Sequence, residues 1–150
     1  MTALKPEPMY GTPAQPDADE TVIARFVPDA PTYWRSHAVL ALIGGVIAGG
    51  ALLIGGNPAP WVGPVAAVLA IGARAAYLKS EALAEEWRLT QRRLLGPAGR
   101  IVPLSSIKLA RPFLGAVQIV TQGGDKHLIK YQADPAATVA RIEAAKAARQ

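Results

Sequence analysis

The stretch GGNPAPWVGP, residues 55–64, lies in the middle of the most apolar part of the chain. No charged residue occurs from Ala38 to Ala73, although charged residues make up 18% of the sequence. This run is longer than the roughly 20 residues that one membrane-spanning helix needs. Pro58 and Pro60 interrupt it, because proline lacks an amide donor and disfavours a helical conformation at the preceding residue. The run therefore divides into two apolar segments.

Each apolar segment is long enough to form a membrane-spanning helix. The sequence predicts two transmembrane helices within residues 37–79, over about residues 38–56 and 61–78. Carbonyl groups freed by the prolines would lack donors in lipid, which places the bend outside the hydrocarbon. Trp61 then lies at the membrane interface, and Pro64 falls in the first turn of the second helix, where a missing amide is tolerated.

Basic residues flank the predicted hairpin and are absent from its bend. They are Arg25, Arg35, Arg74, Lys79, Arg88, Arg92 and Arg93. Lysine and arginine accumulate in cytoplasmic loops, so this distribution predicts that both termini are cytoplasmic. Arg74 lies about one turn inside the second segment, and we expect its side chain to extend to the inner headgroups. A buried functional arginine is the alternative.

Small and aromatic residues mark two further features of the hairpin. The residues expected at the contact between the helices are Ala41, Gly45, Gly49, Gly63, Ala67 and Ala70, most of them spaced four apart. Such stripes let helix backbones approach closely, which predicts packing of the two helices on each other, and a docking face for another membrane protein remains open. The expected interfacial anchors are Tyr33, Trp34, Trp61 and Tyr77.

The region before the hairpin divides into two parts. Residues 1–20 contain four prolines and few apolar side chains, which predicts a disordered tail. Residues 21–36 then hold the β-branched and aromatic residues of a short strand, ended by Pro28, and an interfacial anchor. We expect this strand to join a sheet formed by the C-terminal region.

Residues 81–150 are the candidate folded domain. EEWRLTQRRLL, residues 85–95, alternates in the manner of one half-buried strand. Residues 116–121 and 127–131 predict a hairpin, because glycines in the connection supply positive φ. Asp134 and the proline after it predict the start of a terminal helix. The expected fold class is an α+β membrane protein.

Four runs in this domain resemble the bacterial pleckstrin-homology-like (bPH) domain of small membrane proteins, in which a paired-helix anchor precedes the sheet. They are WRLTQRRLL (87–95), GRIVPLSSI (99–107), GAVQIVTQGGDKHLIKY (115–131) and PAATVARIEAA (135–145). The matching positions are Trp87, Leu89, Thr90, Arg93, Leu94, Gly99, Pro103, Leu104, Ile107, Gly115, Val117 and Ile119. The resemblance implies a strongly bent PH-like sheet capped by the C-terminal helix. It also implies a bacterial cytoplasmic (inner) membrane location, and some similar proteins assemble photosynthetic complexes.

The net charge of +5 at pH 7 favours an anionic partner. The residues expected to contact lipid headgroups or a protein partner are Arg74, Lys79, Arg88, Arg92, Arg93 and Arg100. Because they follow the second apolar segment, they lie within reach of the inner leaflet. No aromatic stacking platform accompanies them, so nucleic acid is not an expected partner. The expected partners are membrane lipids and other integral membrane proteins.

The residues that could carry chemistry are few and scattered. The chain has no cysteine, and its two histidines, His37 and His127, have no further ligand at metal-binding spacing. Glu85 and Glu86 are adjacent, so in a strand they point to opposite faces and cannot work as an acid–base pair. The sequence predicts no catalytic residue, metal or cofactor, and hence no enzyme.

These observations predict an accessory subunit or an assembly or scaffold factor of a larger membrane protein complex. The hairpin would dock in the bilayer, and the PH-like domain would contact another protein. The main alternative is an anionic-lipid-responsive module at the membrane surface. A soluble homo-oligomer that buries the apolar hairpin between its subunits is a third interpretation.

Overall fold

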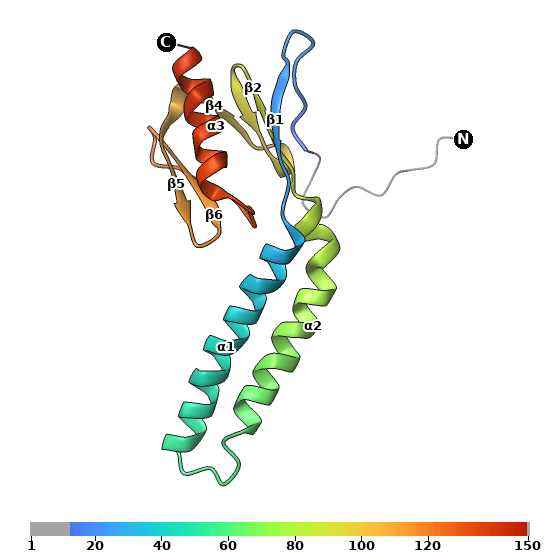
Figure 1. The fold of residues 1–150 in the computed structure, drawn as a ribbon, viewed down its shortest axis with the longest axis vertical. Coiled ribbons are helices and arrows are strands. Elements are labelled where there is room, and N and C mark those ends of the chain that lie inside the picture. Colours follow the sequence, from blue (N-terminus) through green and yellow to red (C-terminus); the bar gives the residue numbers. More distant parts are fainter. Residues whose placement is uncertain (1–12, 150) are drawn as a thin grey trace, which may run out of the picture. The chain divides into compact units, whose positions relative to one another are not determined.

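The computed structural model describes residues 13–149, so most of the predicted disordered tail, residues 1–12, lies outside the described residues. The chain divides into two compact units, shown in Figure 1. The first, which we call the helical unit, is Asp29–Leu83. The second, which we call the sheet domain, combines the described residues before Asp29 with those from Ala84 onward.

The helical unit is a pair of long helices, α1 (Ala30–Ile54) and α2 (Val62–Ala84). Both are long and apolar enough to cross a membrane, as the sequence predicted. At 1.5 Å per residue their 25 and 23 residues extend about 37 and 34 Å, more than the roughly 30 Å of a hydrocarbon core. The hairpin expectation is therefore confirmed at the level of length and composition.

The helices extend beyond the predicted apolar spans. α1 begins eight residues before residue 38, because the Asp29 side chain caps it by accepting hydrogen bonds from the Thr32 amide (3.0 Å) and hydroxyl (2.6 Å). α2 continues six residues past residue 78, through a stretch of good helix formers. The apolar run marks the membrane-compatible part of each helix and not its ends.

The bend between the helices forms as the prolines indicated. Gly56 has a φ of +73°, which glycine adopts without strain, and the Asn57 amide donates to the Leu52 carbonyl at 2.9 Å. The Asn57 side chain accepts a hydrogen bond from the Ala59 amide at 2.9 Å. Pro64 lies in the first turn of α2, where the sequence placed it.

The first sheet of the sheet domain has four antiparallel strands in sequence order. They are β1 (Val22–Phe26), β2 (Trp87–Thr90), β3 (Arg93–Leu95) and β4 (Ile101–Pro103). The short 3₁₀ turns Pro97–Gly99 and Leu104–Ser106 flank β4. β1 joins this C-terminal sheet, as expected, and pairs with β2, with Phe26 opposite Trp87. The helical unit is therefore inserted between two neighbouring strands of one sheet.

The single strand predicted over residues 85–95 is wrong, because the structure has a tight hairpin there. The chain turns between β2 and β3, and the Thr90 hydroxyl accepts hydrogen bonds from the backbone amides of Arg92 (3.2 Å) and Arg93 (3.0 Å). A threonine that satisfies two turn amides with its side chain allows a reversal without glycine or proline. The alternating pattern continued across this reversal and concealed it.

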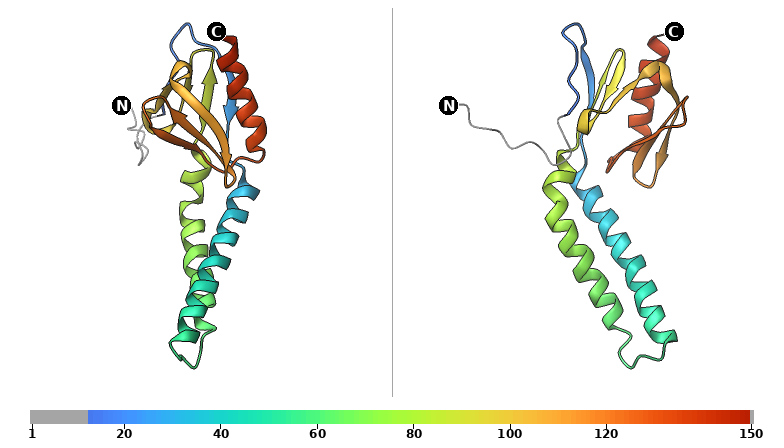
Figure 2. Two further views of the ribbon diagram at one scale, coloured as in Figure 1. Left: turned by 90° about the vertical axis from the view of Figure 1, so that its left-hand side faces the viewer. Right: turned by 180° about the vertical axis from the view of Figure 1, so that it is seen from behind.

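The second sheet has three antiparallel strands: β5 (Ile107–Phe113), β6 (Ala116–Thr121) and β7 (Lys126–Ile129). The β6–β7 hairpin confirms the one predicted from the glycine-containing connection. The terminal helix α3 (Pro135–Ala148) begins at Asp134, whose side chain accepts from the Ala137 amide. α3 packs against β5 and β6, and Arg141 donates to the Ile23 carbonyl of β1, so α3 connects both sheets (Figure 2).

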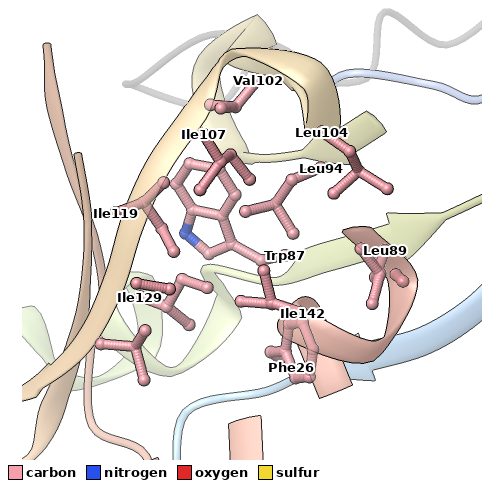
Figure 3. Close-up of a cluster of buried hydrophobic side chains, with 13 residues drawn as sticks. Phe26, Trp87, Leu89, Leu94, Val102, Leu104, Ile107, Ile119, Ile129 and Ile142 are labelled. Atoms are coloured by element: carbon pink, nitrogen blue, oxygen red, sulfur yellow. The ribbon is translucent and has the colours of Figure 1, made fainter. Parts of the chain in front are cut away.

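The two sheets and α3 share one hydrophobic core around Trp87 (Figure 3). Its buried members are Phe26, Trp87, Leu89, Leu94, Val102, Leu104, Ile107, Ala110, Val117, Ile119, Ile129, Ile142 and Ala145. A Cβ at Gly96 would lie 2.6 Å from the Trp87 ring, so only glycine lets the backbone pass over the indole. Phe26 comes from before the helical unit, so the core needs chain from both sides of it.

Candidate functional site

Two surfaces are candidates for function. One is the apolar hairpin, and the other, which we call the basic face of the sheet domain, is the set of predicted contact residues Arg88, Arg92, Arg93 and Arg100. In the hairpin, a Cβ at Gly63 would lie 2.7 Å from the Ala48 carbonyl carbon and 2.7 Å from the Gly49 nitrogen. A Cβ at Gly45 or Gly49 would lie 3.4 or 3.2 Å from Pro64. The backbones of α1 and α2 thus touch at these glycines, and any side chain at Gly63 would separate them.

The residues predicted for helix packing divide into two groups. Gly45, Gly49 and Gly63 lie in this contact, whereas Ala41 and Ala67 are half-buried and Ala70 is exposed. Gly44 also belongs to the contact, because a Cβ there would lie 3.4 Å from the Ile71 side chain. The four-residue spacing that selected Gly45 and Gly49 does not include Gly44. Gly44 faces the Ile71 and Ala67 side chains of α2, whereas Gly45 and Gly49 face Pro64.

Polar and aromatic residues cross-link the other end of the hairpin. The Tyr33 hydroxyl donates to the Ala75 carbonyl at 2.5 Å, and Tyr33 is fully buried. The Tyr33 carbonyl contacts His37 Nδ1 at 2.8 Å. Lys79 Nζ lies 5.7 Å from the centroid of the Trp34 ring, a cation–π contact between α2 and α1. Tyr33, predicted as an interfacial anchor, is thus an interhelical contact.

The other predicted anchors and Arg74 face outward. The exposed fractions are 41% for Trp34, 66% for Trp61 and 79% for Tyr77, and Arg74 is exposed on α2. Large apolar side chains are also exposed along both helices: Val39, Leu40, Leu42, Ile43, Val46, Ile47, Leu53, Ile54, Val62, Val65, Val68 and Leu69. Only 6% of the most apolar part of α1 and 11% of that of α2 is buried.

The basic face of the sheet domain is partly neutralised by the chain itself. Residues 17–20, which we call the acidic segment, lie against the β2–β3 turn. Arg93 donates to Glu20 Oε2 at 2.9 Å, and its Nε lies 2.6 Å from Glu20 Oε1. Arg92 donates to Asp19 at 2.7 Å, and Arg93 also lies 3.5 Å from Asp17. Two cations predicted to contact headgroups or a partner are therefore ion-paired within the domain.

These contacts shift the ionisation of the groups that form them. The hydrogen bond from Arg93 lowers the pKa of Glu20, although burial of its side chain opposes the shift. The same hydrogen bond raises the pKa of Arg93. The hydrogen bond from Arg92 lowers the pKa of Asp19. All three shifts favour the charged forms, so the ion pairs persist at neutral pH.

Backbone contacts also hold the chain next to the acidic segment. Arg88 donates to the Ala14 carbonyl at 2.8 Å, and the Ala14 amide donates to Gly96 at 3.1 Å. The Gln91 side chain accepts from the Thr21 amide at 2.8 Å. Residues 13–20, predicted as the end of a disordered tail, instead pack along the β2–β3 hairpin. Composition indicated disorder because pairing between distant opposite charges cannot be read from it.

The remaining candidates for chemistry have structural partners. Glu86 pairs with Arg25 at 2.8 Å, and Glu85 lies 3.8 Å from Lys130. Burial and then the positive charge of Arg100 lower the pKa of His127, which lies in the second sheet. Within residues 13–149, no group of three or more histidine and acidic side chains is arranged to hold a metal ion. Glu85, Glu86 and His127 are therefore each held in structural contacts of the sheet domain.

No protein-family profile, no characterised protein and no solved structure matches this chain.

Proposed function

We propose that the protein is a non-enzymatic integral membrane protein that acts as an accessory subunit or an assembly or scaffold factor of a larger membrane complex. Its helical unit would cross the bacterial cytoplasmic membrane twice, and both termini and the sheet domain would lie in the cytoplasm. The sheet domain would be PH-like. Its two antiparallel sheets and closing helix agree with the layout that the sequence resemblance implies.

Exposed apolar surface on both helices supports the membrane location. Exposing such surface to water costs roughly 25 cal/mol per Å², and soluble monomers rarely expose contiguous patches beyond a few hundred Å². The two helices bury a narrow contact at Gly44, Gly45, Gly49 and Gly63 and a second contact at Tyr33 and Ala75. The rest of their surface fits lipid or the helices of another membrane protein.

The insertion of the hairpin between β1 and β2 carries the scaffold proposal. A domain appended to one helix could swing on one linker, whereas this domain is joined to both helices. Its connections are short: residues 27–29 lie between β1 and α1, and Glu85 and Glu86 lie between α2 and β2. Two short connections restrict how far the domain moves from the membrane. A domain restrained by two short connections suits a protein that holds partners in place at the membrane surface.

The lipid-responsive alternative receives less support. It requires a free basic face, but Arg92 and Arg93 are paired with the acidic segment. Anionic headgroups would first have to displace those carboxylates. Arg100 remains exposed and available.

Capture from the native membrane tests the proposal. The protein, tagged before residue 13, is extracted in mild detergent and its companions are identified by mass spectrometry. We expect a stoichiometric set of membrane-complex subunits. Recovery of the protein alone with lipid would contradict the proposal and favour the lipid-responsive alternative.

Two glycines provide a sharper version of the capture experiment. A Cβ at Gly50 of α1 or Gly72 of α2 would meet nothing within 4 Å, so both glycines face outward. Gly50→Leu and Gly72→Leu should leave the hairpin intact but obstruct close docking of a foreign helix. We expect each partner that docks at these faces to be lost from the capture. The matched control, Ala70→Leu, enlarges another exposed position of α2.

A further inference from the structure

The connection between β5 and β6 exposes an unusual apolar tip. Leu114 is 90% exposed and Phe113 is 43% exposed. Leu114 and Gly115 have φ values of +49° and +80°, the pattern of a two-residue type I′ turn. Asparagine, aspartate or glycine is preferred at the position of Leu114, because glycine has no Cβ to strain and the polar side chains of the other two can hydrogen-bond locally.

Neither the backbone nor the core accounts for leucine at this position. Its side chain leaves the fold instead of filling a cavity, and its conformation favours other residue types. Backbone strain of this kind is concentrated at functional sites of proteins. Leu114 therefore fits a contact outside the chain.

The tip lies at the end of the sheet domain from which both connections to the helices leave. The Gln132 amide donates to the Gly115 carbonyl at 2.8 Å. Lys130, two residues earlier, lies 3.8 Å from Glu85, the first residue after α2. Figures 1 and 2 show the β5–β6 connection at the same end of the sheet domain as the end of β1 and the start of β2.

The lengths of the two connections limit how far the end of β1 and the start of β2 can lie from the helix ends. Fully extended, the three residues after β1 span about 11 Å and the two before β2 span about 7 Å. Lys79 and Trp34 contact each other, and both residue types are common at the boundary between the hydrocarbon core and the headgroups. We therefore place that boundary at this pair. From Lys79 to the end of α2 is five residues, or about 7.5 Å. This rise matches the roughly 5–8 Å depth of one headgroup layer.

Charges around the tip also suit a membrane surface. Leu109, Arg111 and Phe113 alternate along the outward face of β5. Arg111 donates from its Nε to Gln118, and Lys130 is half-exposed beside Glu85. An apolar tip flanked by cations is the composition of a segment that enters the interface and keeps its charges among the headgroups.

We propose that the β5–β6 tip, Phe113 and Leu114, inserts into the headgroup region of the membrane that the helices cross. This inference rests on the proposed membrane location of the helical unit. The proposed contact of the tip is with the lipid surface and not with a protein partner. The tip would give the sheet domain a third attachment to the membrane in addition to its two connections.

The absence of native cysteine allows a direct test with the full-length protein in lipid vesicles. Single-cysteine variants Pro112→Cys, Gly123→Cys and Val46→Cys carry an environment-sensitive fluorophore, and the vesicles of phosphatidylcholine and phosphatidylglycerol contain nitroxide-labelled lipid. Gly123, in the β6–β7 connection, lies at the far end of β6, about 17 Å along the strand. Val46 reports on insertion of α1.

We expect quenching at Val46 by deep nitroxides, quenching at Pro112 by shallow ones, and none at Gly123. Leu114→Asn in the Pro112→Cys background should weaken the quenching while raising the thermal stability of the domain, because asparagine suits the turn. If Leu114 had only a structural role, the substitution would not weaken the quenching while raising the thermal stability.

Four results would overturn the inference. Quenching at Val46 but not at Pro112 would reject tip insertion and leave the membrane location intact. Equal quenching at Pro112 and Gly123, or no effect of Leu114→Asn, would show a contact that does not depend on the tip. Absence of quenching at Val46 would reject the membrane location and tip insertion together.

Discussion

The hydroxyl of Tyr33 on α1 donates a hydrogen bond to the carbonyl oxygen of Ala75 on α2, at 2.5 Å. Tyr33 and Ala75 are both fully buried, so this hydrogen bond is shielded from solvent. This contact and the glycine contact near the bend hold the hairpin at two separate levels. The hairpin therefore has a defined packing of its own.

Tyr33→Phe should weaken the hairpin without unfolding it. The variant keeps the ring but removes the donor, and a hydrogen bond of this kind contributes about 0.5–1.5 kcal/mol. Thermal unfolding in mild detergent, followed by circular dichroism, measures the effect. Tyr77→Phe is the matched control, because Tyr77 is 79% exposed and should tolerate the change. Equal effects of the two variants would contradict an interhelical role for Tyr33.

Gly63→Ala should separate the helices near the bend. The added Cβ would lie 2.7 Å from backbone atoms of Ala48 and Gly49, which cannot move aside as a flexible side chain can. Overpacking of this kind costs about 1–3 kcal/mol. Gly72→Ala, whose Cβ would meet nothing, should be neutral or stabilising. Both are compared by thermal unfolding in detergent, and a neutral Gly63→Ala would show that the backbones do not touch.

Glu20→Gln should release the acidic segment from the β2–β3 turn. The Glu20 side chain is buried and bonds to Arg93, whereas the Asp19 side chain is 75% exposed. Protease cleavage between residues 13 and 21 should become severalfold faster in Glu20→Gln and change little in Asp19→Asn. Equal cleavage rates in the two variants would contradict a dominant role for Glu20.

The same contact should depend on pH. Because the folded pKa of Glu20 is lowered, the unfolded form binds protons first as pH falls. The stabilising contribution is present above the ordinary pKa of 4.5 and is lost as pH falls through the lowered value. The protection factors of the amides of residues 17–20, which are the intrinsic exchange rates divided by the observed rates at each pH, should fall only below about pH 4.5. A fall in these protection factors between pH 7 and pH 5 would indicate that another group controls the segment.

Local sequence signals predicted part of this structure well. The uncharged run and Pro58 and Pro60 placed the hairpin and its bend, because apolar length and proline sterics act locally. The helix ends were missed, since Asp29 as a cap determines where α1 begins and hydropathy does not record caps. The β2–β3 turn was missed because the Thr90 hydroxyl accepts hydrogen bonds from the turn amides, and the turn contains no glycine or proline to indicate it.

Contacts between distant parts of the chain were harder to predict. Glu20 and Arg93 are separated by 73 residues, and the composition around Glu20 alone indicated disorder. That the N-terminal strand joins a sheet of the C-terminal region was predicted from its β-branched and aromatic residues, but its pairing with β2 was not. The exposure of Leu114 was not, since leucine ordinarily predicts burial and only the turn geometry turns it outward.

Gly96→Ala should destabilise the sheet domain. The new Cβ would lie 2.6–2.8 Å from three atoms of the buried Trp87 indole. A rigid ring in a filled core cannot yield, so we expect a loss of about 1–3 kcal/mol. Denaturant unfolding, followed by Trp87 fluorescence in a Trp34→Phe/Trp61→Phe background, isolates the domain. Gly123→Ala is the control, because its Cβ would make only an ordinary contact with Thr121 Oγ1 at 3.9 Å, and a neutral Gly96→Ala would contradict this packing.

His127 should make the stability of the sheet domain depend on pH in a separate range. Burial first, and then Arg100, lowers its folded pKa below the ordinary 6.5, while Asp125 opposes the shift. Below pH 6.5 the unfolded chain therefore binds more protons, and the free energy of unfolding falls as pH decreases toward the lowered pKa. Denaturant unfolding between about pH 7.5 and about pH 5.5 avoids the carboxylate range. His127→Gln should remove this slope, and Arg100→Gln should reduce it by bringing the pKa of His127 closer to its ordinary value. A slope that survives in His127→Gln would assign the pH dependence to a different group.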